Sequence, residues 1–194
     1  MPTNLRRRSG AVRLSAVRAE PRDDAEQVTQ ALPGEPLDVE EERGDWASIR
    51  TAYGYPGWIR ADALGPPPAE DWPPPAPGEP VEEARAFLGS PYEWGGLTAG
   101  GIDCSGLVHM AYRRIGRLVP RNADQQEEAG RPVREDDLRP GDLVTYGDAE
   151  ADHVAFWLGD GTILHATGRA GVNAVVEEPE PPELRARRRR LIRF

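Results

Sequence analysis

The pattern of apolar and polar residues along this chain of 194 residues changes between its N-terminal third and the remainder. In residues 11–64, short apolar runs are separated by turn residues such as Pro33-Gly34 and Gly44-Asp45, a pattern typical of β-strands. We expect strands at 12–17, 28–32, 37–39, 46–49 and 53–59. Short strands at this density predict a small β-barrel.

A proline-rich segment, residues 65–80, follows the predicted barrel. Its many prolines favour the polyproline II conformation, which makes a semi-rigid spacer. The sequence therefore predicts four parts: an N-terminal tail (1–10), a barrel (11–64), a linker (65–80) and a second domain (81–194).

The second domain mixes helical and strand patterns. A helix is predicted at 81–88, and a second one begins at Cys104, because apolar residues then recur at 107, 108, 111, 112 and 115. The nearly all-apolar run 153–158 predicts a strand that is buried on both faces. Further strands are expected at 162–166 and 172–176, with a closing edge strand at 191–194. The predicted fold class is α+β.

Cys104 is the only cysteine of the chain, so it cannot form an internal disulfide. It stands where a glycine-rich loop meets the predicted helix, with Asp103 as the expected N-cap. The unpaired N–H groups and the dipole of a helix start stabilise an anion, so we expect a lowered thiol pKa and a nucleophile. The competing interpretation is a small buried hydrophobic residue.

The positions of the histidines favour the interpretation of Cys104 as a nucleophile. The chain has only three histidines, and two of them, His153 and His165, stand in apolar, strand-like runs. A nucleophilic cysteine needs a base within hydrogen-bonding reach and a partner that orients the base. A cysteine on a helix, followed by histidines on two successive strands, supplies these parts. His109 is expected to be partly buried or on the surface, outside the site.

Six motifs occur in the order and spacing of one bacterial family: Tyr92-x-Trp-Gly-Gly, Asp103-Cys-Ser-Gly-Leu-Val, Pro120-Arg, Leu138-Arg-Pro-Gly-Asp-Leu-Val, His153-Val-Ala-Phe-Trp-Leu-Gly and Leu164-His-Ala. By these residues the second domain resembles the NlpC-type papain-like cysteine peptidases. The resemblance implies a catalytic set of Cys104, His153 and His165, with Tyr92 assisting the oxyanion hole. It also implies that Arg121 is a structural anchor near the site.

The resemblance also implies a substrate. Members of this family cleave amide bonds in peptidoglycan stem peptides, most often between γ-D-glutamate and a diamino acid, here diaminopimelate or lysine. We therefore expect a cysteine peptidase. Two alternatives stay open: a papain-like amidase or acyltransferase that acts on another amide or thioester, and a wall-binding module with little catalysis.

Residues 11–64 resemble a bacterial SH3-like domain. In the recycling branch of the family, such a domain captures the free amine of an N-terminal L-Ala, so that only trimmed stem peptides fit. By this resemblance we expect Glu26 and Tyr55 to bind substrate, with Glu20 as an alternative carboxylate. Asp103 and Ser105, which flank the nucleophile, complete the predicted substrate site, although Asp103 has the alternative role of helix cap.

Charge and composition argue against several classes of binding partner. The net charge of −9 argues against nucleic acid as the main partner. We expect no cofactor and no metal, because the cysteine and histidines lack local ligand spacing. The basic N-terminus is not followed by an apolar signal-peptide core, and no stretch approaches the ~20 apolar residues of a membrane span. We therefore expect a cytoplasmic protein, with secretion as the alternative if the start site is misassigned.

Overall fold

The computed structural model describes residues 7–68 and 72–194, and the chain separates into two compact units. The first unit runs over Met1–Trp72 and the second over Pro73–Phe194. This division falls within the segment that we expected to be the linker. Residues 1–6 of the expected tail and residues 69–71 of the expected linker lie outside the described residues.

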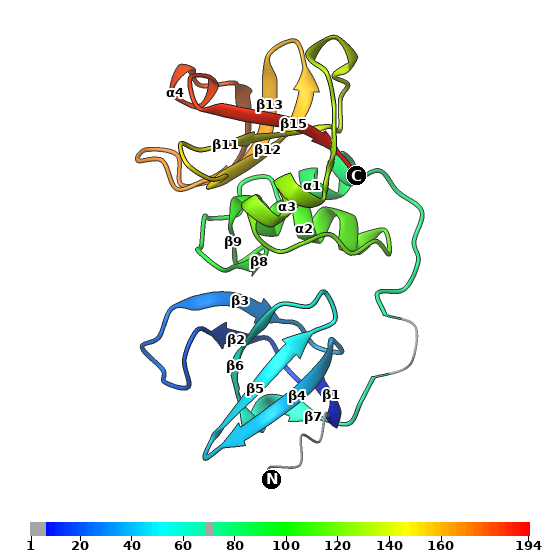
Figure 1. Ribbon diagram of the computed structural model, residues 1–194, viewed down its shortest axis with the longest axis vertical. Helices are drawn as coiled ribbons and strands as arrows, with labels where there is room; N and C mark the ends of the chain where they lie inside the picture. Colours follow the sequence, from blue (N-terminus) through cyan, green and yellow to red (C-terminus); the bar gives the residue numbers. More distant parts are fainter. Residues whose placement is uncertain (1–6, 69–71) are drawn as a thin grey trace. The chain divides into compact units, whose positions relative to one another are not determined.

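Within residues 7–68, the first unit is an antiparallel sheet in the order β3-β2-β6-β5-β4-β1-β7 (Figure 1). Its elements are β1 (Arg7–Ala11), β2 (Ser15–Arg18), β3 (Gln27–Ala31), β4 (Pro36–Arg43), β5 (Trp46–Thr51), β6 (Pro56–Arg60), the 3-10 helix η1 (Ala61–Ala63) and β7 (Leu64–Gly65). Alternation along β5 buries Ala47 and Ile49, which pack in one apolar core with Val17, Leu37 and Ile59. The apolar positions of the sequence therefore do form the inside of this unit.

The first strand differs from the prediction. It begins at Arg7, inside the expected tail, and pairs with β4 and β7. Val12 and Leu14, expected in a strand, lie in or beside the bend between β1 and β2 and are 52% and 46% exposed. The sequence pattern missed β1 because backbone pairing, and not a run of apolar side chains, holds Arg7 and Arg8 in the sheet.

The second unit combines a six-stranded sheet with short helices. Its elements are α1 (Pro80–Arg85), β8 (Leu97–Thr98), β9 (Gly101–Ile102), α2 (Cys104–Arg114), α3 (Ala123–Ala129), β10 (Arg131–Pro132), η2 (Glu135–Asp137), β11 (Leu143–Tyr146), β12 (His153–Gly159), β13 (Thr162–Thr167), β14 (Ala174–Pro179), α4 (Pro182–Arg185) and β15 (Arg188–Arg193). The sheet order is β10-β15-β11-β12-β13-β14, with every pair antiparallel, and β8 and β9 form a separate hairpin. The helix from Cys104 and the strands β12, β13 and β14 were predicted, although β14 begins and ends later than the expected 172–176.

Helix α2 connects the two layers of this unit. It contacts β12 and β13 as well as α1 and α3, which form a helical layer against the sheet (Figure 1). The ring of Tyr112 on α2 stacks on Phe156 of β12, with the centroids 6.3 Å apart. On the neighbouring positions of β12, Ala155 and Trp157 pack into a second apolar cluster with Val144 and Ile163. Strand β12 is therefore covered on both faces, as its apolar run predicts.

Strand β15 is not the edge strand that we expected. It pairs with β11 on one side and with the short β10 on the other. Its arginines contact carboxylates that are nearly inaccessible to solvent: Arg188 pairs with Glu180, Arg189 with Glu127 and Arg193 with Asp142. The basic C-terminal run is thus neutralised within its own unit, which is why an interior place in the sheet is tolerated.

Among the helices in residues 7–68 and 72–194, none is both long and apolar enough to cross a membrane.

Candidate active site

Cys104 is the first residue of α2, and Asp103 caps the helix as predicted. The side chain of Asp103 accepts a hydrogen bond from the backbone N–H of Gly106 at 2.6 Å, while its own backbone is extended. Gly106 has no room for a side chain, because a Cβ there would lie 2.4 Å from the carbonyl oxygen of Gly96. The glycine-rich loop therefore packs directly against the helix start, and Cys104 is only 4% exposed.

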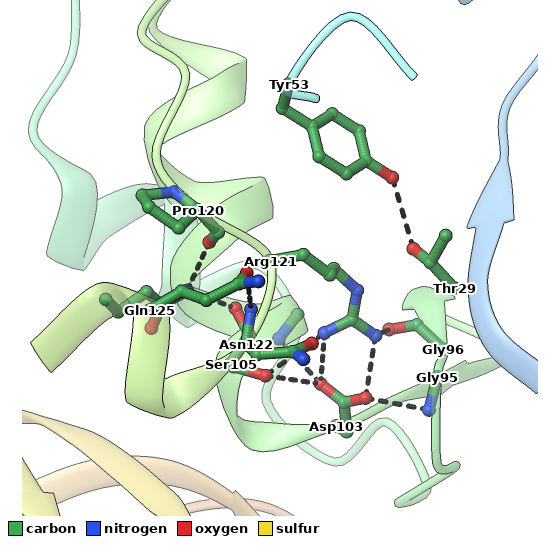
Figure 2. A network of polar contacts seen from close by, with 12 residues as sticks. Thr29, Tyr53, Gly95, Gly96, Asp103, Ser105, Pro120, Arg121, Asn122 and Gln125 are labelled. Atoms are coloured by element: carbon green, nitrogen blue, oxygen red, sulfur yellow. Dashed lines mark hydrogen bonds and ion pairs between the residues drawn. The ribbon is translucent and has the colours of Figure 1, made fainter. Parts of the chain in front are cut away.

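A buried ion pair fixes this arrangement (Figure 2). Arg121, 1% exposed, donates to both carboxylate oxygens of Asp103, at 2.8 and 2.7 Å. Asp103 also accepts from the backbone N–H of Gly95 at 2.7 Å, and Arg121 donates to the hydroxyl of Ser105 at 3.1 Å. Arg121 thus has the anchoring position that the family resemblance implied. A substrate amine would have to compete with these donors for Asp103, so the amine-binding role of Asp103 and Ser105 stays a prediction.

His153 contacts His165 directly, and the backbone of the residue that follows His153 contacts Cys104. Cys104 accepts a hydrogen bond from the backbone N–H of Val154, the residue that follows His153 on β12. Nε2 of His153 lies 2.8 Å from Nδ1 of His165, and the two rings meet edge to face. This contact engages Nε2 of His153 and leaves its Nδ1 outside the contact. A nucleophile, a base and an orienting group are needed in this order, and these roles of Cys104, His153 and His165 stay a prediction.

Burial determines the protonation states of Cys104 and His153. Burial raises the pKa of the Cys104 thiol to about 12, and the Asp103 carboxylate adds to the effect. Burial lowers the pKa of His153 to about 3, and the electrostatic effects of His165 and of the Arg187 cation act in the same direction. The expected lowering of the Cys104 pKa is therefore wrong. A helix start contributes at most ~2 kcal/mol, whereas removing a charge from water costs several kcal/mol.

Tyr92 lies near the nucleophile on the loop before β8. Its backbone bridges to Ile102, just before the cap, and its ring packs on Gly168, where a Cβ would lie 3.1 Å from the ring. Burial, together with the electrostatic effects of Cys104 and of the Asp103 carboxylate, raises the pKa of Tyr92 well above its usual value. The phenol therefore stays protonated, as a hydrogen-bond donor must.

Glu178 and Arg169 are polar groups of the site that the sequence did not single out. Glu178 accepts from Nε2 of His165 at 2.9 Å, and Arg169 donates to both oxygens of Glu178. Glu178 lies on β14 opposite Ile163, two residues before His165 on the neighbouring strand. The predicted strand ended at residue 176, so the signal that could have found Glu178 was the continued alternation Val176, Glu178.

His109 lies in the buried middle of α2, away from this group. It is completely inaccessible to solvent, and its Nδ1 lies 2.8 Å from the carbonyl oxygen of Val119. Burial lowers its pKa to about 3. The expectation of a partly buried or surface histidine is wrong, because α2 is covered by the sheet and by neighbouring helices.

The other predicted binding residues belong to the first unit. Glu26 is exposed just before β3, and Tyr55 is half-buried before β6 with its ring 6.5 Å from that of Tyr53. The hydroxyl of Tyr53 in turn hydrogen-bonds Thr29 at 3.1 Å (Figure 2). In the part of the chain that the structure describes, no group of three or more His, Cys, Asp or Glu residues is arranged to hold a metal ion.

Comparison with known families matches this site to one of them. The model of the NlpC/P60 family covers residues 89–185, half of the chain, and contains Cys104, His153 and His165. This chain belongs to the NlpC/P60 family. A second model, described as a bacterial dipeptidyl-peptidase SH3 domain, covers residues 17–64. The predicted fold class, a papain-like α+β domain preceded by an SH3-like barrel, is confirmed.

Curated relatives of this NlpC/P60 protein share parts of the chain. A γ-D-glutamyl-L-lysine dipeptidyl-peptidase of Bacillus cereus is 34% identical over 118 residues, which cover 58% of this chain and 35% of the relative. The peptidoglycan endopeptidase RipB of Mycobacterium tuberculosis is 38% identical over 104 residues, which cover 47% of this chain and 43% of RipB. The chain thus spans less than half the length of these relatives.

Solved structures agree on the fold. An NlpC/P60 family protein from Bacillus cereus matches 98% of this chain and 64% of its own with a TM-score of 0.58, at 24% identity. The Resuscitation Promoting Factor Interacting protein RipA matches 59% of this chain and 60% of its own with a TM-score of 0.51, at 27–29% identity. RipA was solved in forms mutated at a histidine, a cysteine and a glutamate.

The pKa shifts of the NlpC/P60 site predict how Cys104 reacts with iodoacetamide. Because only the thiolate is nucleophilic, its alkylation rate should rise about tenfold per pH unit from pH 6 to pH 9. At pH 7 it should be slower than the rate for a free thiol of pKa ~8.5, such as N-acetylcysteine. Mass spectrometry of the intact protein measures the rate, and Cys104→Ala gives the blank. An alkylation rate that stays constant between pH 6 and pH 9 would contradict a resting site in which Cys104 and His153 are both neutral.

Proposed function

We propose that this chain is a cysteine peptidase that hydrolyses the γ-D-glutamyl–diamino acid bond of peptidoglycan stem peptides. Its preferred substrate is a short peptide with a free N-terminal L-Ala, and its role is in murein recycling in the cytoplasm. The observation that carries the proposal is the placement of Cys104, at a capped helix start, within hydrogen-bonding reach of the backbone of Val154, which follows His153 of the hydrogen-bonded pair His153 and His165.

The spacing of these residues supports the same assignment. Cys104 and His153 are 49 residues apart, and His153 and His165 are 12 apart. The cysteine, histidine and glutamate at which RipA was mutated are separated by the same 49 and 12 residues. In this chain a histidine, His165, stands at the spacing where RipA has the glutamate. The matching intervals favour Cys104 as nucleophile and His153 as base.

In the first half of the mechanism, the thiol adds to the γ-carbonyl carbon of the glutamyl residue. As the S–C bond forms, Nδ1 of His153 accepts the proton of the thiol. The carbonyl oxygen becomes an oxyanion, which backbone N–H groups at the start of α2 and the hydroxyl of Tyr92 stabilise. His165 holds the ring of His153 through the 2.8 Å contact between Nδ1 of His165 and Nε2 of His153.

In the second half, the tetrahedral intermediate collapses. His153 returns its proton to the nitrogen of the diamino acid, the C–N bond breaks, and the γ-glutamyl group remains on Cys104 as a thioester. Water then attacks the thioester with His153 as base, which releases the γ-carboxylate and restores the thiol. A site that is neutral at rest suits this sequence, since each proton moves only while a carbonyl is under attack.

Two of the relatives' descriptions support the substrate. The Bacillus cereus relative is described as acting on a γ-D-glutamyl-L-lysine bond, and RipB as acting on peptidoglycan. The same Bacillus cereus protein is a dipeptidyl-peptidase, and the barrel of this chain matches a domain described from such enzymes. Since a dipeptidyl-peptidase removes two residues from a free amino end, these matches favour L-Ala-γ-D-Glu as the released product.

Replacement of the catalytic side chains gives the first test. On L-Ala-γ-D-Glu-diaminopimelate, Cys104→Ala and His153→Ala should reduce kcat at least ~10³-fold, whereas His165→Ala should keep a measurable remainder, because an orienting group contributes less. Mass spectrometry of the products measures cleavage, and circular dichroism checks the fold. Full activity of Cys104→Ala would refute the mechanism. No cleavage by the wild type, with turnover of another amide or thioester, would favour the amidase or acyltransferase alternative.

Recognition of the substrate amine gives the second test. Wild-type protein should prefer the free tripeptide to its N-acetylated form by about 10–200-fold, since a lost charge-assisted contact costs ~1.5–3 kcal/mol. Of the candidate residues Glu26, Tyr55, Asp103 and Ser105, Glu26 can be changed without touching the anchor of α2. Glu26→Gln should lose most of the preference, whereas Glu41→Gln, on the exposed end of β4, should retain it. Equal digestion of intact sacculi and free tripeptide by the wild type would contradict the proposal.

A further inference from the structure

The series of hydrogen bonds that joins His153 to His165 continues beyond His165. Nε2 of His165 lies 2.9 Å from Oε1 of Glu178, and the His165 side chain is inaccessible to solvent. Arg169 then holds Glu178 through contacts of 2.9 and 2.6 Å to its two oxygens. Four side chains thus form one series of contacts: His153 on β12, His165 on β13, Glu178 on β14, and Arg169 in the loop between β13 and β14.

The carboxylate at the end of this line determines where the protons lie. An ionised carboxylate only accepts hydrogen bonds, so Nε2 of His165 must carry the proton that is donated to Glu178. A neutral imidazole has one N–H, so Nδ1 of His165 is an acceptor. It therefore receives the N–H of Nε2 of His153, and Nδ1 of His153 is left unprotonated. That nitrogen is the one available to the thiol of Cys104.

We propose that Glu178 is a positioning residue of the reaction, which selects the tautomers of His165 and His153 so that His153 presents an unprotonated Nδ1 to Cys104. The inference rests on the proposed function for its kinetic consequences, but the tautomers themselves are a property of the resting protein. In RipA, a glutamate stands at the spacing of His165. In this chain the carboxylate lies one hydrogen bond further along, on a different strand.

The surroundings keep Glu178 ionised. Burial acts to raise its pKa, but the hydrogen bonds from Arg169 and His165 outweigh burial and hold the pKa below its usual range. Burial lowers the pKa of His165, and the Glu178 carboxylate offsets part of this effect. The other groups near the histidine pair are Tyr146, whose ring centroid is 5.7 Å from that of His153, and the cation Arg187. Within this set of groups, Glu178 is the acceptor that can fix the direction of hydrogen-bond donation from His153 through His165.

Nuclear magnetic resonance of the wild-type protein reads the tautomers directly. Long-range ¹H–¹⁵N correlations at pH 7 should show both His153 and His165 with the proton on Nε2. His109 is an internal reference of the opposite type, because its Nδ1 must donate to the carbonyl oxygen of Val119. Since the chain has only three histidines, His153→Ala and His165→Ala assign the signals. A proton on Nδ1 of His165 or of His153 would overturn the inference, whether or not the protein cleaves the tripeptide.

Kinetics of Glu178→Gln test the consequence. The variant should lose about 10–100-fold in kcat with KM unchanged, because a group that orients a catalytic histidine acts on the chemical step. Loss of the carboxylate also lowers the pKa of the histidine pair, so the acid limb of the kcat/KM profile should move to lower pH. Glu178→Asp, which keeps the charge, should retain more activity than Glu178→Gln.

A neighbouring carboxylate provides the matched control. Glu177 lies beside Glu178 on β14 but pairs with Arg85 of α1, so Glu177→Gln removes a similar ion pair outside the histidine chain. It should leave both kcat and the acid limb unchanged. If Glu178→Gln matches Glu177→Gln in kcat per active site and in its acid limb, and differs only in stability, the role of Glu178 is structural and the inference fails. An inactive wild type would instead refute the proposed function and leave the tautomer measurement to decide.

Discussion

The buried ion pair between Asp103 and Arg121 is the interaction on which the site depends. One carboxylate caps α2, receives the N–H of Gly95 from the glycine-rich loop, and pairs with a guanidinium that is itself 1% exposed. Such a pair adds little net stability over an apolar substitute, but loss of one partner costs ~3–5 kcal/mol because the other stays buried and charged. Its value here is geometric, since it holds the loop, the helix start and Cys104 in one arrangement.

Burial explains how the remaining charges are organised. Cys104 is buried and His153 is partly buried, and desolvation holds each of them in its neutral form. Charge is kept at the edge of the site, where Arg169 and Glu178 neutralise one another and Glu178 reaches the base only through His165. In the proposed mechanism, proton transfer from Cys104 to His153 therefore occurs in a site whose hydrogen-bond directions are already set. This preorganisation lowers the cost of forming charge when a substrate carbonyl is attacked.

Local signals explain what the sequence could predict. Asp103 followed by Cys104 and an apolar helical period identifies a capped helix, and the apolar run after His153 identifies a strand covered on both faces. The interior place of β15 and the early start of β1 depend on which strands pair and in which register, and no local pattern encodes this. Continued alternation past Val176 could have extended the predicted strand to Glu178, but it does not show that Glu178 lies beside His165. The wrong expectation for the Cys104 pKa has a similar origin, because burial depends on the sheet that covers α2.

The most direct test of the account is the acyl-enzyme intermediate. Wild-type protein mixed with excess L-Ala-γ-D-Glu-diaminopimelate is quenched in acid within the first turnover, and the intact protein and its peptides are weighed. The account predicts the added mass of one L-alanyl-γ-D-glutamyl group, located on the peptide that contains Cys104, together with an equal amount of free diaminopimelate. Release of diaminopimelate without acylation of Cys104, or acylation of any other residue, would contradict it.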